Sequence, residues 1–70
     1  MARRNYKKGD RYYNTLVVKS FPNHAFIIKT KNGWYYLLEP NPYDGYWGVK
    51  TDRSIDTCVK HHQKLLKLKL

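Results

Sequence analysis

The chain has 70 residues, of which 14 are Lys or Arg and 5 are Asp or Glu, so its formal net charge is +9 at pH 7. Seventy residues allow one small domain with a thin core, and an aromatic content of 16% suits such a core because large rings bury much area per residue. A charge this large repels itself on a small body, so we expect a polyanionic partner, DNA or RNA, ahead of an acidic protein.

The composition also excludes several classes of protein. A single cysteine, Cys58, rules out an intramolecular disulfide and is typical of a reducing compartment. The start, MARRNYKKGD, lacks the apolar segment of a signal peptide, and no apolar run approaches the roughly 20 residues that span a bilayer. We therefore expect a cytoplasmic protein, associated with nucleic acid and not with a membrane.

The first nine residues differ from the rest of the chain. Residues 1–9 carry Arg3, Arg4, Lys7 and Lys8 with little apolar content, which predicts a flexible basic arm. Residues 10–70 are expected to form one small domain, which opens with a turn at Gly9-Asp10.

Four segments have the β-branched and aromatic content of strands. They are RYYNTLVVKSF (residues 11–21), HAFIIKTK (24–31), WYYLLE (34–39) and YWGVK (46–50). Pro22 ends the first, because proline lacks the N–H that a strand ladder needs. PNPYDG (40–45) predicts a loop, and Gly48 a bulge or kink in the last strand. We expect Trp47 to fill one end of the core.

The C-terminal segment predicts an amphipathic helix over about residues 54–68. Ser54 is placed to cap it, and Asp56 lies in its first turn, where a negative charge opposes the dipole favourably. A helical wheel gathers an apolar side and, opposite it, a basic side of Lys60, Lys64 and Lys67; the apolar side holds Ile55, Cys58, Val59, His62, Leu65, Leu66 and Leu70. The alternative is a strand at 55–60, because IDTCV is poor in helix formers.

Asn32-Gly33, between two predicted strands, indicates a hairpin with a two-residue turn. With that turn Lys31 pairs with Trp34, and alternation sorts the side chains onto two faces. One face would hold Phe26, Ile28, Thr30, Tyr35 and Leu37, and the other Lys29, Lys31, Trp34 and Tyr36, followed by Ile27 and Leu38. Because lysine ammonium groups are rarely buried, the second set predicts an exposed surface of rings and positive charges. The alternative is that these rings pack on lysine stems, or on the helix, and only stabilise the hairpin.

Catalytic and metal chemistry have little support. Cys58 and His61 are three residues apart, but no second cysteine or paired spacing completes a zinc site, and His24 and His62 do not supply one. The carboxylates are scattered over turns and loops, and no glycine-rich phosphate loop is present. We expect no enzyme activity, no metal and no cofactor.

The basic start, KGDRYY before the first strand, the KNGW hairpin, the short YWGVK strand and the terminal helix together resemble the small SH3-like and chromo-like barrels. Among these, the chain is similar in size, charge and element order to the small basic archaeal chromatin proteins. The resemblance implies a barrel of four to five antiparallel strands whose exposed tryptophan lies on the DNA minor groove, a role that would fall to Trp34. The PNPYDG loop departs from that pattern.

The sequence therefore predicts a mainly β, non-enzymatic protein that binds nucleic acid largely without regard to sequence. Trp34 and Tyr36 would contact bases or sugars. The phosphates would be met by Arg3, Arg4, Lys7, Lys8, Lys29 and Lys31, and by a second patch of Lys60, Lys64 and Lys67. The alternative is a small protein-binding module, such as a viral or mobile-element inhibitor of a host nucleic-acid enzyme, with WYY and YDGYW as its hot spots and an acidic host protein as its partner.

Overall fold

The structure, a computed structural model, describes residues 6–43 and 45–68, and it consists of five antiparallel strands followed by one helix. The elements are β1 (Arg11–Tyr12), β2 (Thr15–Ser20), β3 (Phe26–Lys29), β4 (Tyr35–Pro40), β5 (Tyr46–Asp52) and α1 (Ile55–Leu68). The strands form one sheet in the order β1-β2-β3-β4-β5. The mainly β fold with a C-terminal helix is confirmed. Within the described residues β1 and β5 are the two edges, so the sheet is open.

The predicted first strand, residues 11–21, is wrong in one respect, because the chain turns back at Tyr13-Asn14. Tyr13 has a φ of +56°, a left-handed conformation that is uncommon for a residue other than glycine. The Thr15 hydroxyl donates to the Tyr12 carbonyl at 2.6 Å across this turn. The result is a short β1–β2 hairpin in place of one long strand, and this makes the fifth strand.

Two bulges bend the sheet. In β2 the register shifts between Val17 and Lys19, which leaves Val18 as an extra residue. In β5 it shifts between Gly48 and Lys50, so Val49 is the extra residue, next to the glycine that predicted an irregularity. A bulge increases local twist, so both curl the sheet. Each also reverses which side of its strand the following residues face.

The two faces of the sheet carry separate hydrophobic clusters. On one face Val17, Phe26, Ile28 and Leu38 are buried beneath Tyr6, Tyr12 and Tyr46, and we call this set the tyrosine cluster. Its rings meet edge-on or tilted, with the Tyr6 ring centre 4.9 Å from that of Phe26 and 5.7 Å from that of Tyr46. Such contacts add to the burial of area, which gives a small core more stability per residue.

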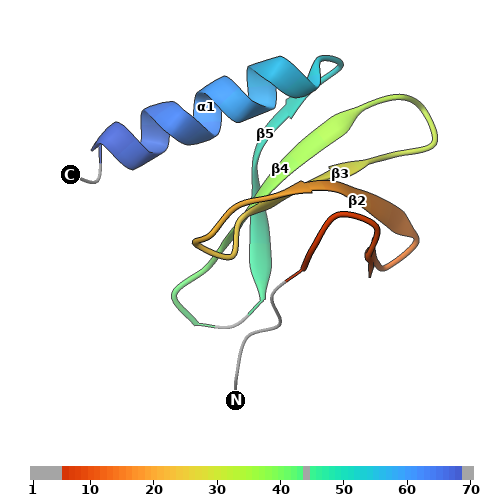
Figure 1. Cartoon of the computed structure of the whole chain (residues 1–70), viewed down its shortest axis with the longest axis horizontal. Helices are drawn as coiled ribbons and strands as arrows, with labels where there is room; N and C mark the ends of the chain where they lie inside the picture. Colours follow the sequence, from red (N-terminus) through yellow and green to blue (C-terminus); the bar gives the residue numbers. More distant parts are fainter. Residues whose placement is uncertain (1–5, 44, 69–70) are drawn as a thin grey trace.

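Tyr6 belongs to the segment predicted as a flexible arm. Residues 1–5, with Arg3 and Arg4, lie outside the described residues. The backbone N–H of Gly9 donates to the Val17 carbonyl at 2.9 Å, and the N–H of Asp10 donates to the Lys7 carbonyl at 2.9 Å. Residues 6–9 are thus held against the sheet, and Tyr6 packs on the face opposite α1 (Figure 1).

The other face is covered by α1, and we call its contacts the helix cluster. Ile27, Leu37 and Cys58 are fully buried, with Val18, Phe21, Tyr35, Val49, Ile55 and Val59 packed around them. The helix spans Ile55–Leu68, close to the predicted 54–68, so the strand alternative for residues 55–60 is wrong. Ile55, Cys58, Val59 and His62 of the predicted apolar side lie on the sheet, because residues three and four apart share one helix face. Leu66 of that side is exposed, and Leu70 lies outside the described residues.

A buried polar contact lies within this face. His62 of α1 is 1% exposed, and its Nδ1 is 3.5 Å from Oε2 of Glu39, which is also buried. The imidazole stacks on Phe21 with ring centres 3.9 Å apart. Glu39, the last residue of the predicted strand 34–39, pairs with Trp47 across β4 and β5. The helix therefore buries a carboxyl group of the sheet along with the apolar side chains.

None of the described helices is long and apolar enough to cross a membrane.

Cys58 gives a direct test of the helix packing. Burial raises the pKa of its thiol, and the Sγ atom lies 3.7 Å from the Tyr35 carbonyl oxygen, to which it can donate. We expect the native thiol to react with a disulfide reagent about a hundredfold or more slower than in denaturant, because reaction needs local opening. A Cys58→Ala, Ser54→Cys variant, with its thiol at the exposed residue before α1, is the control and should react fast. Equal native and denatured rates for Cys58 would show that α1 is not packed on the sheet.

Candidate nucleic-acid interface

The turn between β3 and β4 has three residues, Lys31, Asn32 and Gly33. The N–H of Thr30 donates to the Trp34 carbonyl at 2.8 Å, and the N–H of Trp34 donates to the Thr30 hydroxyl at 3.2 Å. Gly33 has a φ of +81°, whereas Asn32 is not among the described residues with positive φ. A two-residue type I′ turn needs positive φ at both central positions, so the predicted Asn32-Gly33 turn is wrong by one residue.

This one residue changes which side chains share a face. Lys29 pairs with Tyr35 and Ile28 with Tyr36, whereas the predicted register paired Lys29 with Tyr36. Paired residues lie on the same face, so Lys29 is on the α1 side and Tyr36 on the side of the tyrosine cluster. The predicted single surface of Lys29, Lys31, Trp34 and Tyr36 is therefore wrong. Leu37 is buried as expected, but toward α1.

The structure gives Trp34 a partner that the sequence did not suggest, Arg53. Its guanidinium carbon lies 4.8 Å from the centre of the Trp34 ring, a cation–π arrangement. Because β5 continues to Asp52, which pairs with Tyr35, the next residue comes opposite Trp34. The predicted strand ended at residue 50, and this hid the contact.

Tyr36 is the next ring along this side of β4. It pairs with Ile28 on one neighbouring strand and with Thr51 on the other, and its side chain is 37% exposed. Alternation along the strand places Trp34 and Tyr36 on the same side. Beyond Tyr36 this side of the sheet is covered by the tyrosine cluster. Tyr36 is thus exposed and Trp34 half-buried, and both lie at one end of the face.

Several cations lie at the same end of the sheet. The register Arg11–Leu16–Lys29–Tyr35–Asp52 forms one row across all five strands, and Lys31 and Arg53 lie just beyond it. The Lys29 ammonium is 5.8 Å from the centre of the Tyr35 ring. We call this region the hairpin end, defined by Arg11, Lys29, Lys31, Trp34, Tyr36 and Arg53. The carboxylate of Asp52 accepts the Ser54 N–H at 2.8 Å, which ties it to the start of α1.

The other predicted basic residues lie elsewhere. Lys60, Lys64 and Lys67 are exposed on α1, on the side that the helical wheel predicted to be basic. Lys7 and Lys8 are exposed on the N-terminal segment, where Lys8 lines a groove with Lys19, Ile55 and Val59. The predicted phosphate contacts are therefore spread over three regions and do not form one patch.

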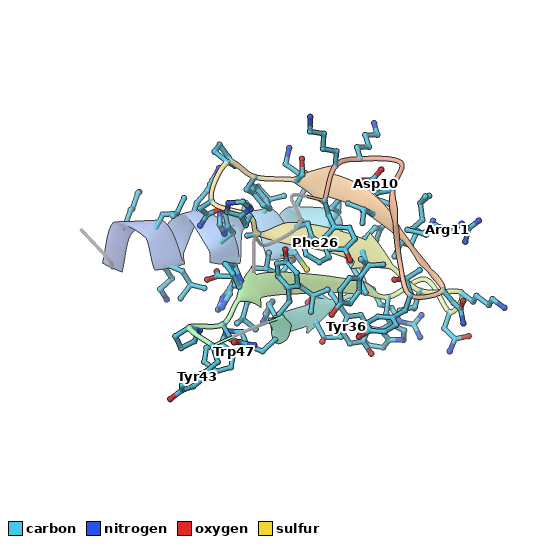
Figure 2. The ribbon with its side chains drawn as sticks, turned by 90° about the horizontal axis from the view of Figure 1, so that it is seen from below. Asp10, Arg11, Phe26, Tyr36, Tyr43 and Trp47 are labelled. Atoms are coloured by element: carbon cyan, nitrogen blue, oxygen red, sulfur yellow. The ribbon has the colours of Figure 1, made fainter. Side chains whose placement is uncertain are left out.

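A second aromatic surface lies at the opposite end of the sheet. Figure 2 shows Arg11 at one end and Tyr43 and Trp47 at the other. Tyr43 is 92% exposed and Trp47 is 52% exposed, so the prediction that Trp47 fills the core is wrong. It is Tyr46 that packs in the tyrosine cluster, one residue out of phase with the expectation. Trp47 instead lines a groove with Pro40, Pro42, Val49 and Leu65.

No group of three His, Cys, Asp or Glu side chains that could hold a metal ion occurs among residues 6–43 and 45–68. The chain matches no protein-family model, and no curated protein and no solved structure is significantly similar to it. The geometry and charge of its own surfaces are thus what bears on function.

A double-mutant cycle tests the register of the hairpin end. Trp34→Leu and Arg53→Ala should show a coupling free energy of about 0.5–1 kcal/mol in the free energy of unfolding, because each removes one half of the cation–π contact. The matched control is Trp34→Leu with Lys31→Ala, the pair that a two-residue turn would place opposite each other. Its coupling should be near zero in urea unfolding measurements. Coupling in the Lys31 cycle but not in the Arg53 cycle would mean that the turn has two residues and that the predicted register is right.

Proposed function

We propose that this chain is a non-enzymatic nucleic-acid-binding protein whose main contact surface is the hairpin end. The observation that carries the proposal is the Trp34 ring with the Arg53 guanidinium over it, beside the exposed Tyr36 and next to Lys31 in the turn. Arg11 and Lys29 lie at the same end of the sheet but on its other face, where they can meet the backbone of a strand that passes around this end. Rings stack on bases whatever their identity, and lysine and arginine neutralise phosphates. A surface that combines aromatic rings with cations therefore suits a ligand that has both bases and phosphates.

The overall charge supports the same ligand class. A net charge of +9 on 70 residues creates a positive field that favours a polyanion and speeds its encounter. Lys60, Lys64 and Lys67 on α1 add a second patch that a longer strand of nucleic acid would reach. These groups contact phosphates and base faces, and few of them can read the donor and acceptor pattern of base edges. We therefore propose binding that is largely independent of sequence.

The closed, SH3-like form of the fold is part of this proposal. Tyr6 contacts both Phe26 of β3 and Tyr46 of β5, so the N-terminal segment spans the open side of the curled sheet. A barrel-like body closed by side chains in this way would hold the hairpin end rigid. The free, buried Cys58 suits a reducing compartment such as the cytoplasm.

The second candidate function is protein binding at the Tyr43–Trp47 surface. Two large exposed rings beside a groove of proline, valine and leucine side chains are typical of interface hot spots. The positive charge would steer the chain to an acidic partner, such as a host nucleic-acid enzyme. Saturable binding to one protein that persists at high salt would favour this function.

Salt dependence tests the lead function. If roughly five to eight phosphates are neutralised, affinity for an oligonucleotide long enough to reach α1 as well should fall about a hundredfold or more between 50 and 200 mM salt, because bound counterions are released on association. Lys31→Gln and Arg53→Gln should each reduce the slope of log K against log salt by about 0.7–0.9. Lys64→Gln, which removes a lysine of α1, is the matched control. Its affinity for an octanucleotide should equal that of the unaltered chain, because a strand this short is held at the hairpin end. Absence of binding to any DNA or RNA at low salt would contradict the proposal.

A further inference from the structure

We infer that the ligand of the hairpin end is a single strand, with two successive bases stacked on Tyr36 and on the Trp34–Arg53 pair. This inference rests on the proposed nucleic-acid binding and adds the strandedness of the ligand. It comes from the spacing of the rings, from the contacts that hold them, and from the limited extent of the exposed face.

The spacing of the two rings favours unstacked bases. Trp34 and Tyr36 are two residues apart on one side of an extended strand, so their Cβ atoms are separated by about 6.6 Å. Successive bases of one strand of a duplex are about 3.4 Å apart and cover each other's faces. Two rings at about twice that interval can each cover a base only when the strand is extended and its bases are splayed apart. Single strands allow this at little cost.

Both stacking positions are fixed before any ligand arrives. The backbone of Trp34 exchanges hydrogen bonds with Thr30, and its ring is held by Arg53. Tyr36 is paired between Ile28 and Thr51 in the middle of the β3–β4–β5 ladder. Arginine stacks on ring faces and also donates hydrogen bonds to phosphate, so Arg53 can hold the indole and meet the strand backbone together. Rigid rings lose little conformational freedom on binding.

The exposed part of the face is too short to follow a duplex groove. Beyond Tyr36 the same side is occupied by Phe26 and Leu38 and their covering tyrosines. On the β3–β4–β5 part of this side the two rings remain, flanked by Lys31 in the turn and by Arg53 after β5. Neither ring could stack on a base inside a duplex without being wedged between base pairs, which costs unstacking energy. A single strand presents its base faces without that cost.

The first test compares two eight-nucleotide strands and one duplex of eight base pairs at one salt concentration. They are octathymidylate, the same strand with abasic sites at its two central positions, and a hairpin duplex with an eight-base-pair stem. Octathymidylate should bind most tightly. The abasic strand keeps all the phosphates, and its affinity should be lower by at least roughly 5- to 150-fold, which is the loss expected for one stacked base. The Trp47→Phe variant leaves Trp34 as the single tryptophan of the two. Its fluorescence should be quenched by octathymidylate and much less by the abasic strand.

The second test removes one ring. Tyr36→Ala should weaken octathymidylate binding by roughly 5- to 150-fold, and Tyr36→Phe, which keeps the ring, should restore it. The slope of affinity against salt should stay unchanged in both, because no charge is lost. Tyr43→Ala, at an exposed tyrosine on the other end of the sheet, is the matched control and should bind as the unaltered chain does. Circular dichroism melts establish that each variant is folded.

Two results would overturn the inference and leave the proposed function standing. One is equal affinity for the intact and the abasic strand, which would mean that binding depends on phosphates alone. The other is tighter binding to the duplex, with Trp34 unquenched by the single strand. Failure of all three ligands to bind at low salt would overturn the proposed function as well.

Discussion

The three-residue turn of Lys31, Asn32 and Gly33 governs the whole sheet. Two hydrogen bonds join its ends: the Thr30 N–H donates to the Trp34 carbonyl, and the Trp34 N–H donates to the Thr30 hydroxyl. Gly33 supplies the left-handed conformation that closes the turn. Because side chains alternate with a period of two, this turn length assigns Ile27 and Leu37 to the helix and Ile28 and Leu38 to the tyrosines. A turn one residue shorter would instead put Leu37 on the face of Ile28 and Leu38 on the face of Ile27, as the predicted register did.

The sheet is thin, and each face needs its own cover. On one side α1 supplies it, and on the other the N-terminal segment and the β1–β2 hairpin bring Tyr6 and Tyr12 over Phe26. The bulges at Val18 and Val49 supply the curvature that lets so few residues enclose both clusters. The end of the sheet around Trp34 and Tyr36 lies beyond the tyrosine cover, and this keeps it accessible.

The surfaces left uncovered differ in chemistry. The hairpin end combines rings with cations, α1 presents lysines alone, and the Tyr43–Trp47 surface combines rings with prolines. Stacking needs rings and charge neutralisation needs cations, and among the described surfaces the hairpin end has both, which is why the proposed function is assigned to it. The third resembles a protein-binding surface, and occupation of one end of the sheet leaves the other free. The two proposed functions therefore use separate surfaces.

The sequence by itself determined the features that depend on neighbouring residues. The helix over Ile55–Leu68 follows from its apolar period, the four strand-forming runs from their β-branched and aromatic content, and the positive field from a count of charges. Only the tertiary structure decided the faces. One extra residue in the β3–β4 turn, one at Val18 and one at Val49 each reverse the side on which later residues lie, and neighbouring residues alone do not dictate these insertions. For this reason Tyr46 is inside and Trp47 outside, Glu39 lies against His62, and Arg53 covers Trp34. These contacts join residues distant in the sequence, so they exist only once packing has selected a single register.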